Sequence, residues 1–205
     1  MNNCRIKWAA FDFGGVLAEE GFVNGLQAIA KQEGLDSDYL LETAKKTILS
    51  SGYLVGKALE ESFWKALRRE TGISRTDQDL RNEILSRFVL RPWMLKIVSH
   101  LRARGVKTAI VSDQVNWLDE LDVRDSFFQH FDRVYNSFHV NMSKNDPAIF
   151  EELVQWVGCA PGDIVFIDDH LPHIKRAGSR GLNTIHYTDR QSFIKDLSAF
   201  CPDLS

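Results

Sequence analysis

Acidic and hydroxyl side chains follow three separate apolar runs of this sequence. Asp12, Ser112 and the adjacent pair Asp168–Asp169 each come directly after at least three consecutive apolar residues. One acid after a strand is commonly a turn or cap residue. The ends of parallel strands, however, meet at one edge of a sheet, where ligands bind in open α/β folds. We therefore expect these side chains to form a single site.

The residue types at these ends indicate phosphate chemistry. Carboxylates gathered at one edge repel each other, and a hard divalent cation such as Mg²⁺ relieves that repulsion. One carboxylate can also attack a phosphoryl group and form an aspartyl phosphate. A lysine would neutralise charge, and a serine hydroxyl would donate to a phosphate oxygen. The glycines after the first acid, Gly14 and Gly15, would let the backbone approach a ligand closely.

Four apolar runs predict the strands that position the site: 6–13, 106–111, 164–167 and 182–187. Most of these are nearly continuous in apolar residues, which is typical of central strands covered on both faces. Helical patterns lie between them, for example the stripe at i, i+3, i+4 and i+7 in residues 94–101. Alternating strands and helices predict an α/β fold with a doubly wound, Rossmann-like parallel sheet.

Residues 19–91 show only helical stripes. The sequence predicts that this segment is an all-helical insertion, which leaves the α/β core after its first strand. The core would then comprise residues 1–18 and 92–205. A glycine and a proline punctuate the two edges, at positions 21 and 92.

The order of these motifs resembles the haloacid dehalogenase (HAD) superfamily. The resemblance covers essentially the whole chain, and it extends to the subfamily with a helical cap between motifs one and two. The matching stretches are FDFGGVL at 11–17, IVSD at 110–113, SKNDPAIF at 143–150, FIDD at 166–169, and for the cap residues 52–64.

The resemblance implies a hydrolase with Asp12 as its nucleophile, helped by Ser112 and Lys144. Its substrate would be a small phosphorylated metabolite, and its cofactor Mg²⁺. The implied metal ligands are Asp12, the backbone carbonyl of Gly14, and Asp168 with Asp169 in support. The implied phosphate-binding residues are Gly14, Gly15, Ser112, Asp113 and Lys144.

Position 14 departs from the family's phosphatases, which carry an aspartate two residues after the nucleophile as general acid and base. Gly14 keeps a carbonyl for the metal but has no side chain. General acid–base catalysis contributes about 10²–10⁴-fold, so the loss should slow the chemistry without abolishing it. Good leaving groups, such as acyl phosphates and sugar 1-phosphates, should suffer least, and another residue, for example from the cap, could substitute.

Three further residues near the motifs have open roles. Asp113 stands where asparagine is common, and it would either lie near phosphate or cap a helix. His170 and His173 follow the acidic pair. A metal-ligand role is the weaker interpretation because Mg²⁺ prefers oxygen ligands. The alternative is a loop histidine and a helix-start histidine, one of which could donate a proton.

Composition narrows the partners and the compartment. The formal net charge of −3 gives no electrostatic reason to expect nucleic acid, and no apolar run approaches the ~20 residues of a membrane span. The cysteines Cys4, Cys159 and Cys201 are widely spaced, which predicts neither a disulfide nor a zinc site. That spacing and the lack of a signal peptide predict a cytoplasmic protein, as a monomer or homodimer.

Two other functions compete with a phosphatase. A 2-haloacid dehalogenase also uses an aspartate nucleophile without a second aspartate, but the family's dehalogenases need no metal and lack the acidic pair. A non-catalytic or regulatory protein could bind a phospholigand with the same fold. Asp12 argues against that alternative, because a binding module would have little need of a nucleophile.

Overall fold

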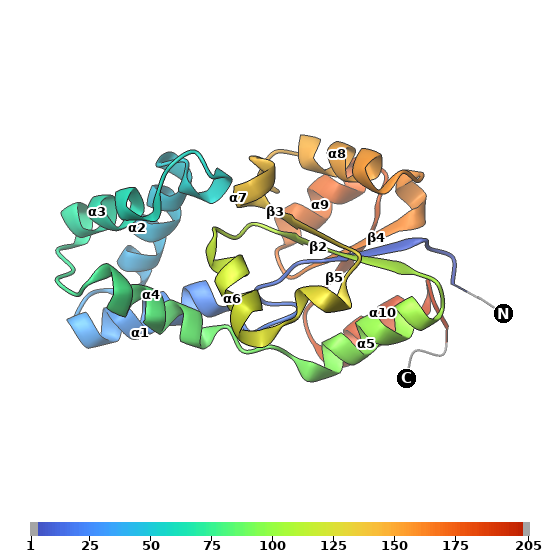
Figure 1. Cartoon of the computed structure of the whole chain (residues 1–205), viewed down its shortest axis with the longest axis horizontal. Coiled ribbons are helices and arrows are strands. Elements are labelled where there is room, and N and C mark those ends of the chain that lie inside the picture. Colours follow the sequence, from blue (N-terminus) through green and yellow to red (C-terminus); the bar gives the residue numbers. More distant parts are fainter. Residues whose placement is uncertain (1–3, 203–205) are drawn as a thin grey trace.

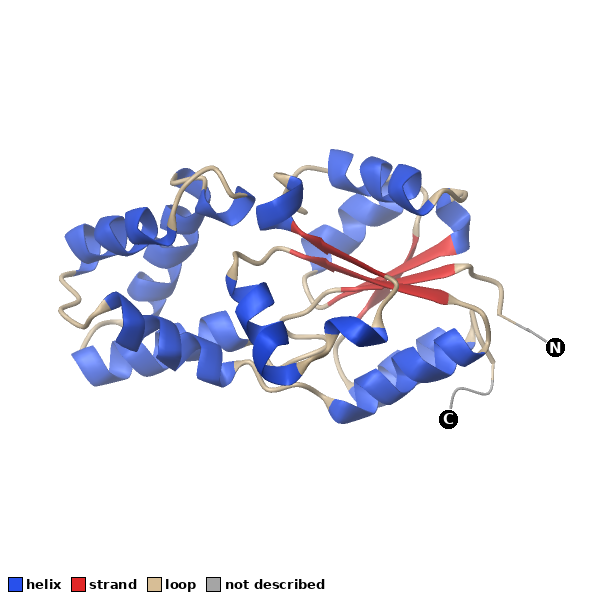
Figure 2. Ribbon diagram, viewed as in Figure 1, coloured by secondary structure: helices blue, strands red, loops and turns tan. Residues whose placement is uncertain are grey.

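Five parallel strands form the centre of the structure, in the order β3-β2-β1-β4-β5 (Figure 2). The computed structural model describes residues 4–202. The predicted doubly wound α/β sheet is confirmed, and the four predicted strands correspond to β1, β2, β4 and β5. The strands are β1 (Trp8–Phe11), β2 (Lys107–Ser112), β3 (Arg133–Asn136), β4 (Ile164–Asp168) and β5 (Asn183–His186).

The edge strand β3 was not predicted from the sequence. Its four residues, RVYN, include only Val134 and Tyr135 as apolar residues, and both are half-buried. A strand at the edge of a sheet has one neighbour instead of two, so it does not require the continuous apolar run that marks β1, β2 and β4. β3 pairs in parallel with β2, with Asn136 opposite Ser112.

Alternate side chains of the strands enter two separate cores. Phe11, Ile110 and Val165 belong to one core, and Ala10 and Phe166 to the other. Each fully buried apolar side chain contributes roughly 1.5–3 kcal/mol, so both faces must be covered. Figure 1 shows α5 and α10 on one face and α8 and α9 on the other. These helices are α5 (Pro92–Ala103), α10 (Arg190–Ser198), α8 (Ala148–Val157) and α9 (Leu171–Ser179).

The helices between β1 and β2 form a helical lobe, residues 21–87, that lies beside the sheet (Figure 1). Side-chain caps at Asp36 and Thr76 begin two of its helices, and left-handed glycines, Gly34 and Gly72, end two others. The structure assigns no strand between Gly21 and Arg87. The lobe contains α1 (Gly21–Glu33), α2 (Ser37–Ser50), the 3₁₀ turn η1 (Tyr53–Val55), α3 (Glu60–Thr71) and α4 (Asp77–Arg87).

The two connections between lobe and sheet run side by side. The amide of Glu19 donates to the Val89 carbonyl at 2.9 Å, and the amide of Arg91 donates to the Leu17 carbonyl at 2.8 Å. The Arg91 guanidinium also donates to the carbonyl of Val16 at 3.1 Å. These contacts fix the chain directly after Asp12. The remaining elements are α6 (Trp117–Asp125), α7 (Ser137–Val140) and the 3₁₀ turns η2 (Phe128–His130) and η3 (Pro161–Asp163).

Cys4 and Cys201 form a disulfide, with their Cα atoms 4.1 Å apart. The prediction of no disulfide was wrong for this pair, because the fold brings together two cysteines 197 residues apart in sequence. Cys159 is free. The cytoplasmic location, which was inferred partly from unpaired cysteines, stays a prediction. None of the described helices is both long and apolar enough to cross a membrane.

Candidate active site

Asp12 lies directly beyond β1, the central strand of the sheet. After β1 the chain adds β2 and β3 on one side of it, and then β4 and β5 on the other side. The Asp12 amide donates to the carbonyl of Ile167 at 2.9 Å, so the chain stays paired with β4 past the last residue of the strand. Its Oδ1 accepts from the amide of Phe13 at 2.7 Å. The residue is only 9% exposed. The carboxylate is thus held in one orientation at the position where α/β sheets bind ligands.

Lys144 places a buried ammonium between two carboxylates. Its Nζ lies 2.8 Å from Asp12 Oδ2 and 2.7 Å from Asp168 Oδ2. The side chain is 1% exposed. A buried lysine requires compensating charge, and the two acids supply it. This contact brings together three residues that are distant in sequence and that the motifs assigned to one site.

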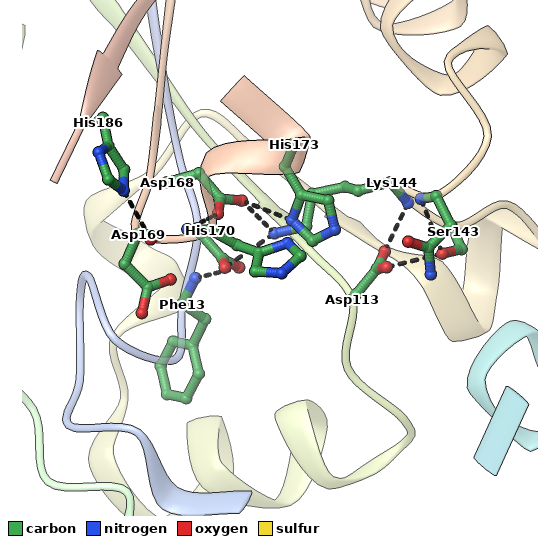
Figure 3. A network of polar contacts seen from close by, with 11 residues as sticks. Phe13, Asp113, Ser143, Lys144, Asp168, Asp169, His170, His173 and His186 are labelled. Atoms are coloured by element: carbon green, nitrogen blue, oxygen red, sulfur yellow. Dashed lines mark hydrogen bonds and ion pairs between the residues drawn. The ribbon is translucent and has the colours of Figure 1, made fainter. Parts of the chain in front are cut away.

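The loop that carries Lys144 is anchored by Asp113 (Figure 3). Asp113 Oδ2 accepts from the Ser143 hydroxyl at 2.7 Å, and its Oδ1 accepts from the Lys144 amide at 2.8 Å. The cap position of α6 is Asn116, so Asp113 does not cap that helix. Because both of its oxygens accept hydrogen bonds from the loop, we infer that Asp113 positions Lys144. A phosphate contact for Asp113 stays a prediction.

Asp168, at the end of β4, is fully buried and accepts three hydrogen bonds (Figure 3). Its Oδ1 accepts from the His170 amide at 2.7 Å, and its Oδ2 lies 3.2 Å from His173 Nδ1 and within reach of Lys144. The contact with His173 was not predicted from the sequence. The position of a histidine in the first turn of a helix does not indicate which carboxylate its ring will contact. His173 is placed to orient Asp168 and not to replace it as a ligand.

Asp169 explains why residue 15 is glycine. A Cβ on Gly15 would lie only 2.0 Å from Asp169 Oδ2, and Gly15 has a φ of +78°, which side chains rarely adopt. His186 Nε2 lies 2.9 Å from the backbone oxygen of Asp169 and steadies the turn. The close approach of backbone and carboxylate thus depends on the absence of a side chain at position 15.

Asp12, Asp168 and Asp169 could hold a metal ion. One carboxylate oxygen from each lies within 4.8 Å of the others, a spacing at which a single hard cation can contact all three. Three acids face the single ammonium of Lys144, so the group retains excess negative charge. All the ligand atoms are oxygens, which suits Mg²⁺ better than softer metals. The residues present therefore fit a divalent cation.

Opposing effects set the protonation of these groups. Burial raises the pKa of Asp12 well above its ordinary value, and Lys144 only partly offsets this. Burial would also raise the pKa of Asp168, but Lys144 and His173 outweigh it and hold that pKa far below its ordinary value. Burial would lower the pKa of Lys144, yet the charges of Asp12 and Asp168 raise it. The mutual contact therefore favours the charged forms of both Lys144 and Asp168.

The other predicted residues lie around this centre. Ser112 ends β2 and is 3% exposed. Because Phe11 pairs with Ile110, the register places Ser112 one residue further along its strand than the position opposite Asp12. Gly14 does not share the left-handed conformation of Gly15. A contact from Ser112 to phosphate, or from the Gly14 carbonyl to a metal, stays a prediction.

Aromatic side chains fill the space between the lobe and the core. Tyr53, Phe63 and Trp64 of the lobe and Trp117 of α6 are at most 1% exposed, so these rings pack in a core. The Tyr53 hydroxyl donates to Asn116 Oδ1 at 2.5 Å. This contact joins η1 of the lobe to the start of α6.

The lobe also contacts the α/β core at α7, the short helix that follows β3. The Ser137 hydroxyl donates to the Leu54 carbonyl at 2.8 Å, and the Asn141 side chain donates to the Val55 carbonyl at 2.8 Å. α7 and η1 therefore hold the lobe against the loops that surround Asp12. Asp168 is fully buried, whereas the side chain of Asp169 is exposed to solvent.

Comparison with known proteins gives a consistent set of relatives. Residues 6–178 match the family described as haloacid dehalogenase-like hydrolase. The bifunctional epoxide hydrolase 2 of Mus musculus is 30% identical over 216 residues, which cover 94% of this chain and 38% of that protein. The chain thus spans about two fifths of the length of the curated relatives it matches.

Solved structures share the fold. A HAD family enzyme from Bacteroides thetaiotaomicron, in complex with magnesium and inorganic phosphate, superposes with a TM-score of 0.72 at 21% identity, covering 92% of this chain and 98% of that one. L-2-haloacid dehalogenase from Xanthobacter autotrophicus, with chloropropionic acid covalently bound, gives a TM-score of 0.66 at 16% identity, covering 97% and 86%.

Proposed function

The chain belongs to the haloacid dehalogenase-like hydrolases, and on that premise we propose that it is a Mg²⁺-dependent phosphatase of a small phosphorylated metabolite. The observation that carries the proposal is the contact of Lys144 with both Asp12 and Asp168, beside the third acid Asp169. A nucleophile, a cation and a metal-binding set are then present together. The bound magnesium and phosphate of the bacterial neighbour support the same chemistry.

Asp12 would attack phosphorus as the bond to the leaving oxygen breaks, with the bonding electrons passing to that oxygen. Water would then attack the aspartyl phosphate, release inorganic phosphate and restore the carboxylate. Lys144 offsets negative charge on Asp12 and the phosphoryl oxygens, while the Ser112 hydroxyl donates to one of them. Mg²⁺ on Asp12, Asp168, Asp169 and the Gly14 carbonyl would supply further charge neutralisation.

The helical lobe would serve as the cap of this enzyme. Residues 19–91 would form the cap and residues 1–18 and 92–205 the catalytic core, with the paired connections at 17–19 and 89–91 as the boundary. The hydrogen bonds between η1 and the α7 region would support a closed position of this cap. Substrate would then enter when the cap opens, and closure would exclude water during the reaction.

The acidic centre favours phosphate chemistry over dehalogenation. A dehalogenase needs no metal, whereas three carboxylates around one lysine leave a charge excess that a divalent cation would balance. A non-catalytic phospholigand-binding protein remains the other alternative. It would not require the carboxylate of Asp12 to be held rigidly by the Phe13 amide.

A substrate screen tests the proposal. The purified chain would be incubated with phosphorylated metabolites and Mg²⁺, and released phosphate would be measured beside Asp12→Asn and beside excess chelator. We expect phosphate release that both controls abolish. Release that survives Asp12→Asn would contradict the nucleophile. Halide release from 2-chloropropionate without metal would favour the dehalogenase, and tight phosphate binding without turnover the binding protein.

A further inference from the structure

Gly14 leaves the proposed reaction without a proton donor on the loop after β1. Phosphate esters of alcohols need one, because an alkoxide is a poor leaving group. The space beside Gly14 is nevertheless occupied. A Cβ at this position would lie 3.1 Å from Glu20 Oε2, and the next nearest side chain, Phe88, follows at 3.4 Å. A carboxyl group from elsewhere in the chain thus reaches the place from which a side chain at position 14 would extend.

The two oxygens of Glu20 have different surroundings. Oε1 accepts from the amides of Phe22 and Val23, at 3.1 and 3.2 Å, and so caps the first turn of α1. These two contacts fix the carboxyl plane and leave Oε2 as the oxygen beside Gly14. An acid that only capped the helix would not need its second oxygen beside Gly14.

The surroundings of Glu20 differ from those of Glu19. Burial raises the pKa of its carboxyl, the charge of Asp169 adds to this, and the Val23 amide opposes it. Its exposed neighbour Glu19 differs, because a hydrogen bond from Arg91 lowers its pKa. The two adjacent glutamates thus have different surroundings: Glu20 is half-buried beside Gly14, whereas Glu19 is exposed.

We propose that Glu20 is the general acid and base of this enzyme, in place of a side chain at Gly14; the inference rests on the proposed phosphatase function. In the first step Glu20 Oε2 gives its proton to the leaving oxygen as the phosphorus–oxygen bond breaks. In the second step the Glu20 carboxylate takes a proton from the attacking water, while the bond from phosphorus to Asp12 breaks and its electron pair returns to that carboxylate. Every atom and charge on the protein is then restored.

By this assignment Glu20, the N-cap residue of α1, is a catalytic residue. Glu20 lies next to the connection where residues 17–19 pair with residues 89–91, so the acid is attached at the base of the lobe. The wild-type enzyme should therefore hydrolyse alkyl phosphates at rates close to those of aryl phosphates, despite Gly14.

A leaving-group series tests the assignment. Glu20→Gln keeps an oxygen to cap α1 but has no acidic proton. We expect kcat/KM to fall by about 10²–10⁴-fold for alkyl phosphates and by no more than about 3-fold for 4-nitrophenyl or acetyl phosphate. The matched control is Glu19→Gln, which removes the neighbouring carboxylate and should leave both classes of substrate unchanged.

Rescue provides a second measurement. Gly14 does not have a left-handed φ, and its nearest obstacle is the end of a flexible side chain, so Gly14→Asp in the Glu20→Gln background should restore alkyl phosphate hydrolysis. An equal loss for all leaving groups would mean that Glu20 only caps the helix, and a steep leaving-group dependence in wild type would also overturn the assignment. Activity that survives Asp12→Asn would instead overturn the proposed function. A wild type without any phosphate release would overturn both.

Discussion

The edge of the sheet formed by the strands' carboxyl ends (the sheet edge) and the helical lobe differ in the kind of side chain that they bury. At the sheet edge, buried charges lie within hydrogen-bond distance of one another, as in the contacts of Lys144 with Asp12 and Asp168. In the lobe the buried side chains are mostly aromatic or aliphatic, and ion pairs such as Arg87–Glu83 lie at the partly exposed surface. A buried charge depends on particular partners, whereas a buried ring depends mainly on volume. The sheet edge should therefore tolerate far fewer substitutions than the lobe.

Among the substitutions at the sheet edge, Asp12→Asn should cause the largest loss of activity without a loss of stability. We expect kcat to fall on the order of 10⁴–10⁶-fold, as when a nucleophile is removed. Stability should not fall, because burial raises the pKa of Asp12 and its ionised form therefore destabilises the fold at pH values above the ordinary carboxyl range. Denaturant titration of the metal-free proteins at pH 7 measures this. A large loss of stability would show that Asp12 compensates the buried charge of Lys144 more than Asp168 does.

Lys144→Met should have the largest effect on stability. Removing the shared cation leaves two buried carboxylates unpaired, at a cost of about 3–5 kcal/mol. In wild type the lowered pKa of Asp168 gives stability that is present above the ordinary carboxyl pKa and is lost as pH falls below it. Without Lys144, burial would raise the pKa of both acids.

The variant should then gain stability relative to wild type as pH falls from about 7 to about 5, and Mg²⁺ should reduce the difference at pH 7. Unfolding free energies at the two pH values, with and without Mg²⁺, measure both effects. A difference from wild type that stayed constant across them would contradict the charge argument. In the lobe, replacing a surface lysine such as Lys65 serves as the control and should cost less than about 0.5 kcal/mol.

The two regions also differ in what could be predicted from the sequence. Asp12, Ser112 and Asp168 could be found because each follows a buried run, and parallel strands bring such ends together. The roles of His173 and Glu20 could not be predicted. His173 contacts Asp168, and Glu20 lies beside Gly14, but only the folded structure brings these residues together and no sequence motif marks the contacts. The disulfide between Cys4 and Cys201 was missed for the same reason.

The adjacent glycines Gly14 and Gly15 allow a comparison within the site itself. Gly15→Ala would place a Cβ 2.0 Å from Asp169 Oδ2 at a φ of +78°, with about 1–2 kcal/mol of backbone strain and displacement of a predicted metal ligand. A Cβ on Gly14 would lie 3.1 Å from the flexible end of Glu20 and at an ordinary contact distance of 3.4 Å from Phe88, so Gly14→Ala should cost less than about 1 kcal/mol. Thermal unfolding and the Mg²⁺ concentration for half-maximal activity measure the difference. Equal effects of the two substitutions would remove the argument that Asp169 requires glycine at position 15.

Tyr53→Phe should have the smallest effect and tests how the lobe acts on the site. The ring packs against Phe63, Trp117 and Phe138 with centroids 5.9–6.3 Å apart, and phenylalanine keeps these contacts. The substitution removes the hydrogen bond to Asn116, at about 1 kcal/mol of stability.

The effect of Tyr53→Phe should also not depend on pH near neutrality. Burial raises the pKa of Tyr53, and the charge of Glu60 raises it further, so the hydroxyl remains protonated. Because the hydroxyl joins the lobe to α6 without facing the acids, its loss should change kcat/KM by less than about 5-fold, and equally for alkyl and aryl phosphates. That equality distinguishes a residue that holds the lobe closed from one that moves a proton. If Tyr53→Phe altered the leaving-group dependence as Glu20→Gln should, the proton would come from the aromatic layer, and the division between a chemical sheet edge and a packing lobe would fail.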